Sequence, residues 1–184
     1  MSDERPNPTS ADVSARLAWP DDAAAIAALQ HDHWVRTYGD QVDPDQLAAL
    51  DTTEMTARWN QLITAPRDAR MRTLVALERA TMRGFALVHP CHDPDADQVA
   101  DAEIGEFVVD AAHQREGHGS RLLHACVDTV RADGFTRAVW WVSPTDDVLR
   151  AWLLDAGWAA DGAHREFEGA TGPLKQIRLH TDLS

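Results

Sequence analysis

Cysteine is scarce in this chain, which has only Cys91 and Cys126 among its 184 residues. Two thiols are too few for the disulfide framework of a small secreted domain, so we expect both to be reduced in a cytoplasmic protein. Long apolar runs are also missing, and no segment reaches the roughly 18 residues of a membrane span. The N-terminus is polar and acidic, without an apolar signal segment. The sequence therefore predicts neither a disulfide-rich scaffold nor a membrane protein.

Positive charge is in short supply, with 17 Lys and Arg against 30 Asp and Glu and a formal net charge of -13. This excess argues against nucleic-acid binding through bulk electrostatics and is compatible with a cationic acceptor such as an amine. Internal repeats and domain linkers are absent as well. We expect a disordered tail over residues 1–13 and a single domain over residues 14–184.

The most informative stretch runs from residue 102 to residue 131. It begins with an apolar strand that carries Ile104 and Phe107–Val109. Gly105 interrupts this strand, and an internal glycine often marks a β-bulge or a backbone that another group approaches closely. We therefore expect some amides of this strand to be free of sheet pairing.

A glycine-containing loop follows the strand and leads into a helix. The loop reads Gln114-Arg115-Glu116-Gly117-His118-Gly119-Ser120, and the helix has one apolar face formed by Leu122, Leu123, Cys126, Val127 and Val130. N–H groups in the first turn of a helix lack intrahelical partners, and the helix dipole adds about half a positive charge there. The glycines lack a Cβ atom, which lets a diphosphate approach the backbone. Strand, loop and helix together are typical of a phosphate site.

Two common phosphate-binding motifs do not fit this loop. The dinucleotide fingerprint needs a third glycine where Leu122 stands, and the NTPase loop needs Gly-Lys-Ser/Thr where the chain has Gly119-Ser120-Arg121. The remaining pattern, Gln/Arg-x-x-Gly-x-Gly/Ala, resembles the acyl-CoA-binding signature of the GNAT superfamily of N-acetyltransferases. An ordinary helix start without a ligand and a nucleotide or sugar-phosphate site are the alternative interpretations.

The order of expected elements also resembles the GNAT fold, from about residue 14 to residue 181. Strands are predicted over residues 14–18, 72–78, 84–89, 102–109, 137–143, 162–168 and 174–180. Helices are predicted from Trp19, from Pro44 with a break near Asp51, from the loop to Gly134, and from Pro144 to Gly157. The resemblance implies an α/β (α+β) fold, with a mixed central sheet of about seven strands, about four flanking helices and a splay between the fourth and fifth strands.

The resemblance also implies how a cosubstrate is held. In this family the loop backbone binds the pyrophosphate of CoA, and amides near the end of the fourth strand hold the pantetheine and the oxyanion. Carried onto this chain, acetyl-CoA would be bound by Phe107, Val108, Val109, Gln114, Arg115, Glu116, Gly117, His118, Gly119, Ser120 and Arg121. Asp146 stands where the family often has an asparagine near the pantetheine.

Acetyl transfer to an amine requires a base for the ammonium, donors for the oxyanion and departure of the thiolate. Glu103 stands at the position of the glutamate base in histone-acetyltransferase members, and Glu106 is the second candidate because a bulge leaves its facing open. The family's usual tyrosine acid is replaced by Leu153. The one tyrosine of the chain, Tyr38, is far away in the first helix.

Trp34 and Tyr38 fall on the helices that line the acceptor side in this family, so we expect them at the acceptor site. The acceptor is predicted to be a small-molecule or peptide amine, with no nucleic-acid or membrane partner, and the exposed final strands suggest a homodimer. The histidines of the His31-Asp32-His33 and 89–93 segments do not form a convincing ligand set, so no metal is predicted.

The sequence thus predicts an N-acetyltransferase that uses acetyl-CoA and is attacked directly by a primary amine in a ternary complex. The loss of the tyrosine at Leu153 motivates a second hypothesis, a non-catalytic acyl-CoA-binding or regulatory domain.

Overall fold

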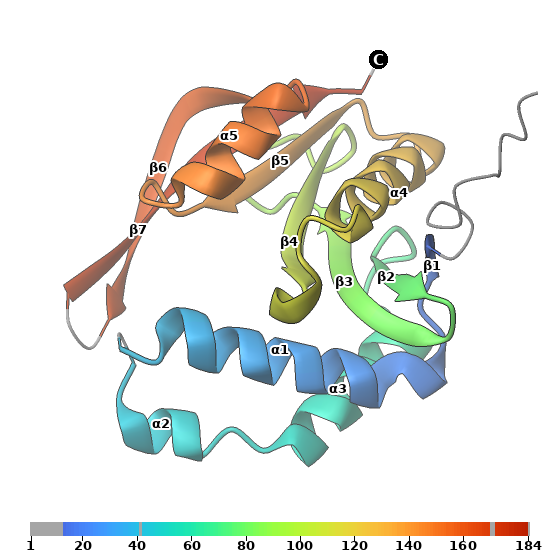
Figure 1. Ribbon diagram of the computed structural model, residues 1–184. Helices are drawn as coiled ribbons and strands as arrows, with labels where there is room; N and C mark the ends of the chain where they lie inside the picture. Colours follow the sequence, from blue (N-terminus) through green and yellow to red (C-terminus); the bar gives the residue numbers. More distant parts are fainter. Residues whose placement is uncertain (1–12, 41, 170–171, 184) are drawn as a thin grey trace, which may run out of the picture.

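A seven-stranded mixed sheet forms the centre of the structure, with helices on both of its faces (Figure 1). The computed structural model describes residues 13–40, 42–169 and 172–183. The strands are β1 (Val13–Leu17), β2 (Arg72–Glu78), β3 (Thr81–Pro90), β4 (Asp101–Val109), β5 (Arg137–Val142), β6 (Ala159–Gly169) and β7 (Gly172–Asp182). The helices are α1 (Ala23–Tyr38), α2 (Pro44–Ala48), α3 (Thr52–Thr64), α4 (His118–Ala132) and α5 (Asp147–Asp155), with short 3-10 turns η1 (Pro20–Asp22) and η2 (Ala111–His113).

The strands lie in the order β1-β2-β3-β4-β5-β7-β6, and every neighbouring pair is antiparallel except β4 and β5. Two apolar clusters fill the layers. One lies between the sheet and the helices α4 and α5, with Leu122 and Leu153 fully buried in it. The other lies between the sheet and the helices α1 and α3, and it contains Ile26 and Trp59. The predicted class, a mixed sheet flanked by helices, is confirmed.

The start of α3 and the end of α4 lie where the sequence predicts them. Asp51 accepts a hydrogen bond from the backbone N–H of Thr53 and so caps α3 at the expected break. Gly134 has φ +89° after the end of α4, and the N–H of Phe135 returns to the carbonyl of Val130. This is the left-handed glycine that commonly ends a helix.

The predicted splay is present between β4 and β5. Their parallel pairing covers only Asp101–Ile104 against Arg137–Trp140, and the rest of β4 has no partner on that side. The predicted bulge is present as well, because Leu87 of β3 pairs with Glu106 whereas the next residue pairs with Ile104. Gly105 is therefore the extra residue of β4. Splay and bulge together open one edge of this strand.

Some strands extend beyond their predicted bounds. β3 begins at Thr81 because the turn after β2 continues the antiparallel ladder. The ladder between β6 and β7 runs from Ala159 opposite His180 to Gly169 opposite Gly172, and the added first residues of β6 are exposed. Ladder pairing there does not depend on apolar alternation, so the sequence pattern did not reveal it. The predicted tail, residues 1–13, lies outside the described residues except for Val13, which opens β1. In the part of the chain that the structure describes, no helix combines the length and apolarity needed to cross a bilayer.

Candidate active site

The loop before α4 has an unusual backbone shape. Arg115 has φ +64°, and Gly117, the N-cap of α4, has φ +89° and ψ -4°. Left-handed residues in a loop turn successive N–H groups toward one side and form a concave anion site. A non-glycine residue in this region carries a conformational cost, which is typical of functional loops.

The N–H groups from Arg115 through Ser120 have no hydrogen-bond acceptor among the described residues. The first bond of the helix is made by the N–H of Arg121, which donates to the carbonyl of Gly117 at 3.1 Å. No side chain caps the helix, and Gln114, Arg115 and Glu116 are all exposed. The loop is therefore open, with its donors available to a ligand.

His118 differs from the other predicted binding residues because its side chain is only 1% exposed. Its Nε2 atom lies 3.5 Å from Oε2 of Glu116, and neither ring nitrogen makes a hydrogen bond within the described residues. Only the backbone N–H of His118 remains as a donor for a ligand at the loop. Ser120 and Arg121 have exposed side chains in the first turn of α4.

The loop adjoins the open end of β4. A Cβ atom added at Gly119 would lie 3.6 Å from Cγ2 of Val109 and 3.9 Å from the ring of Trp152, which is ordinary contact. Asp110 anchors the turn between them, because it accepts a hydrogen bond from the N–H of Ala112 and lies 2.8 Å from Nδ1 of His113. The loop before α4 and the end of β4 are thus held side by side.

On the α4 and α5 side, aromatic rings surround the splay. The Phe107 ring lies 4.8 Å from the Trp140 ring and 6.0 Å from the Trp152 ring. Phe107, Val108 and Val109 pair with β3 but have no partner on the side of β5. Backbone groups on this free edge can bind an extended ligand.

The bulge brings the two candidate bases to one face of the sheet. Ala102 and Ile104 pack in the cluster under α4, so Glu103 lies on the opposite face, toward α1. If β4 alternated regularly through Gly105, without a bulge, Glu106 would lie on the α4 face. With the bulge, Glu106 lies on the α1 face and accepts a hydrogen bond from Nε2 of Gln30 at 3.2 Å.

Burial raises the pKa of Glu106 to about 7, although the hydrogen bond from Gln30 lowers it in part. The amide of Gln30 is itself held by Nε1 of Trp59, which donates to Oε1 at 2.8 Å. Sequence reasoning missed Gln30. Its spacing from Ile26 and Ala27 places Gln30 on the buried face of α1. A polar residue at a buried position of the helix was the sequence signal that could have identified it.

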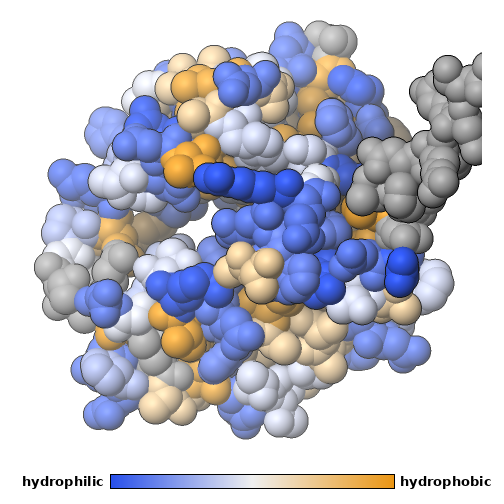
Figure 2. Space-filling model, in the orientation of Figure 1, coloured by the Kyte–Doolittle hydropathy of each residue, from blue (hydrophilic) through white to orange (hydrophobic). Residues whose placement is uncertain are grey.

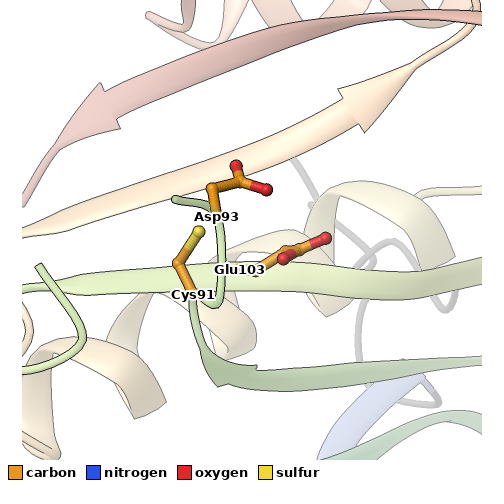
Figure 3. A group of neighbouring side chains, drawn as sticks. All are labelled: Cys91, Asp93 and Glu103. Carbon is orange, nitrogen blue, oxygen red and sulfur yellow. The ribbon is translucent and has the colours of Figure 1, made fainter. Parts of the chain in front are cut away.

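Glu103 lies in a different environment, close to Cys91 and Asp93 (Figure 3). One ligand-type atom of each residue lies within 4.8 Å of the others, so a thiol and two carboxylates gather beside the sheet. Oδ2 of Asp93 already accepts hydrogen bonds from Arg178 and from the indole of Trp141. Burial raises the pKa of the Cys91 thiol to about 12. In this state the thiol is protonated and Asp93 is bonded to arginine, and neither is a good metal ligand.

The pKa of Glu103 is raised from its ordinary value, mainly by burial, while the nearby His89 and Arg165 oppose this rise. Charged neighbours therefore oppose the rise in the pKa of Glu103, whereas only the neutral amide of Gln30 opposes the rise in the pKa of Glu106. Of the two carboxylates, Glu106 has the environment better suited to a base near neutral pH.

The remaining predicted residues divide between the site and the scaffold. Trp34 packs against the cluster under α1. The pKa of Tyr38 is raised by burial and further by the negative charge of Glu106, so this tyrosine is within electrostatic reach of β4 and is not remote from it. Oδ1 of Asp146 caps α5 by accepting from the N–H of Leu149. Leu153 is fully buried, so its position has no contact with a reacting group.

The surface is hollowed between α1 and the part of the molecule that carries β5 and α5 (Figure 2). The open edge of β4 lies at this level in the ribbon view, with the loop before α4 at its end (Figure 1).

Comparison with known proteins agrees with this geometry. Residues 24–157 match the sequence model of the acetyltransferase (GNAT) family. Among curated proteins, no sequence matches the chain.

Solved structures show the same fold at low sequence identity. An N-acetyltransferase from Staphylococcus aureus Mu50 is 18% identical, with a TM-score of 0.74 over 95% of this chain and 100% of that chain. The YncA protein of Salmonella typhimurium, solved with acetyl-CoA, is 20% identical, with a TM-score of 0.72 over 94% of this chain and 95% of that chain. The ribosomal-protein-S18-alanine N-acetyltransferase of Escherichia coli is 16% identical, with a TM-score of 0.63 and 94% of each chain covered.

Proposed function

Because the chain belongs to the acetyltransferase (GNAT) family, we propose that it transfers an acetyl group from acetyl-CoA to a primary amine by direct attack in a ternary complex. The observation that carries this proposal is the row of unpartnered N–H groups from Arg115 to Ser120, beside the open edge of β4. Acetyl-CoA supplies the reactive thioester. The residues of the chain bind it, orient the amine and accept its proton.

The loop has the properties that a diphosphate requires. Its amides converge at the N-terminus of α4, and Arg115 and Arg121 are exposed beside them. Hydrogen bonds to a charged acceptor contribute roughly 1.5–3 kcal/mol each. Three or four of them account for micromolar affinity, which corresponds to about 8 kcal/mol. Local donors can therefore bind an anion despite the net charge of -13.

On the acceptor side, Glu106 is the proposed base, with Glu103 as the second carboxylate. Oε1 of Glu106 is held by Gln30, and Oε2 has no hydrogen-bond partner among the described residues, so it can take a proton from the acceptor's ammonium group and leave the neutral amine to attack the thioester. The amides between Phe107 and Val109 that point away from β3, on the open edge of β4, are proposed to stabilise the oxyanion. Trp34 and Tyr38 are proposed to line the acceptor site.

No side chain at the family's usual position can donate a proton to the departing thiolate, because that position is Leu153, which is buried in the core. A CoA thiolate is a tolerable leaving group, so protonation from solvent suffices in this proposal. Leu153 is also the observation that favours the second candidate, a non-catalytic acyl-CoA-binding domain. Turnover decides between the two.

Two measurements test the proposal. Titration calorimetry with acetyl-CoA should give micromolar affinity, and absence of binding at hundreds of micromolar would contradict it. Release of free thiol should then be followed over a panel of small amines, polyamines and peptide N-termini. Sustained release that falls in Glu106→Gln would exclude the non-catalytic domain, whereas tight binding without release from any amine would support it.

A further inference from the structure

Gln30 is a buried polar residue in an apolar layer. Its side chain is 7% exposed, and the other buried residues of α1 are Ala23, Ile26 and Ala27. A primary amide removed from water is costly unless both of its ends are hydrogen-bonded. Here both ends are bonded, one to Trp59 of α3 and the other to Glu106 of β4. The amide thus links three separate elements of the fold.

The chemistry of the two partners fixes the orientation of this amide. An indole Nε1–H can only donate a hydrogen bond, so the atom of Gln30 that faces Trp59 must be the carbonyl oxygen. The NH₂ group of Gln30 then faces Glu106. In this orientation Gln30 can donate to the carboxylate but cannot accept from a protonated carboxyl group. The contact therefore favours the ionised form of Glu106.

The other groups around Glu106 do not supply this function. β3 places Leu87 opposite it, and α3 contributes the neutral ring of Trp59. The titratable neighbours are Tyr38 of α1 and, on the same face of β4, Glu103, and neither of them brings a positive charge. In the described part of the chain, Gln30 is the only residue that makes a hydrogen bond to the side chain of Glu106.

We propose that Gln30, locked in one orientation by Trp59, is a positioning residue that favours the ionised form of Glu106 and holds its carboxylate with Oε2 free. This inference rests on the proposed function for its catalytic meaning, because it assigns Gln30 and Trp59 to the base of that reaction. The geometric link itself can be tested without a substrate.

The test is a carbon-13 NMR titration of the glutamate carboxyl groups in the folded protein, with the Glu106 signal assigned by its loss in Glu106→Gln. Gln30→Met keeps the size of the side chain and removes the donor. The pKa of Glu106 should then rise by about one to two units, the size expected for loss of one hydrogen bond to a charged group. Trp59→Phe keeps an aromatic ring but releases the amide of Gln30, so a smaller rise in the same direction is expected.

Met55→Leu serves as the matched control, because Met55 is buried in the same cluster and makes no hydrogen bond to Glu106. Its Glu106 titration should match that of the wild type. An unchanged Glu106 titration in folded Gln30→Met would overturn the inference. If Gln30→Met does not fold, Trp59→Phe decides by the same criterion.

The two proposals fail in different ways. Shifted titrations in a protein that acetylates no amine would support the link and remove its catalytic role. Unshifted titrations in an active enzyme would overturn the link and leave the acetyltransferase proposal standing.

Discussion

At the scale of single residues, Glu106 and Glu103 differ in what surrounds them. Burial raises the pKa of Glu106 to about 7, and the base is competent only when ionised. We therefore expect kcat/KM to rise as the pH increases through about 7 and to level off above it. A pH profile of acetyl transfer checks this. A profile that is flat from pH 6 to about 8 would contradict Glu106 as the base.

Substitution of the same residue gives a second prediction. Glu106→Gln should lower kcat by about 10²- to 10⁴-fold, the usual contribution of a general base, and leave the affinity for acetyl-CoA unchanged. Glu103→Gln is the matched comparison, since it changes the other carboxylate of the same strand face. We expect the smaller loss for Glu103→Gln. The reverse order would assign the base to Glu103.

At the scale of elements, the bulge of β4 is built against β3. A Cβ atom added at Gly105 would lie 2.5 Å from Nε2 of His89, so the imidazole must move to admit it. Gly105→Ala should destabilise the fold by about 1–3 kcal/mol, as overpacking does. The same change in a His89→Ala background should cost clearly less. Urea denaturation of the four proteins gives the coupling energy, and equal costs in both backgrounds would show that the contact is unimportant.

A buried arginine helps to tie the loop between β3 and β4 to the far strands. Arg178 of β7 is 4% exposed and donates to Asp93, Asp95 and Asp161. Arg178→Met removes the hydrogen bonds of a buried cation, while Asp161 keeps Arg137 and Asp93 keeps the indole of Trp141 as partners, so it should lower the free energy of unfolding by about 1.5–3 kcal/mol. Arg150→Met, which removes a partly exposed ion pair with Asp147, should cost under about 1 kcal/mol. Similar losses in thermal melts of both variants would contradict this assignment.

The same network predicts a pH dependence of stability. The hydrogen bonds from Arg178 hold the pKa of Asp95 at about 2, and the pKa of Asp161 is also below its usual range. Lowered carboxyl pKa values add stability above the unfolded value near 3.9, and this is lost as the pH falls toward about 2. Acid unfolding should therefore be shallower in Arg178→Met than in the wild type. Parallel acid transitions would argue against the network.

At the scale of the whole molecule, the net charge of -13 should attract a cationic acceptor over long range. The screening length falls from about 30 Å at 0.01 M salt to about 8 Å at 0.15 M. KM for a cationic amine should therefore rise with salt while kcat stays constant. A neutral amine of similar size serves as the control, and equal salt effects on both would contradict electrostatic attraction.

Much of this molecule could be predicted from local patterns. The apolar run of β2, the capping residue Asp51 and the terminal Gly134 each specify their element through nearby residues. Gly105 inside β4 indicated the bulge, and the loop up to Ser120 indicated an open helix start. These features depend on backbone rules that act within a few residues.

The rest depends on contacts between distant segments. Gln30 meets Glu106 across 76 positions, and Arg178 meets Asp93 across 85, so neither contact has a local signature. The preference for Glu106 over Glu103 follows from the exact site of the bulge, since a shift of one residue exchanges the two faces of a strand. The proximity of Tyr38 to β4 likewise follows from how α1 crosses the sheet.

The central claim is that the loop before α4 binds the diphosphate of acetyl-CoA through its backbone, and a pair of glycine variants tests it most directly. Gly117 and Gly134 share φ +89°, and a Cβ atom at either would meet nothing within 4 Å. Gly117→Ala and Gly134→Ala should thus have a similar conformational cost of roughly 1–2 kcal/mol. Titration calorimetry should show acetyl-CoA affinity reduced about tenfold or more in Gly117→Ala and unchanged in Gly134→Ala. Equal, wild-type affinity in both variants would contradict the account.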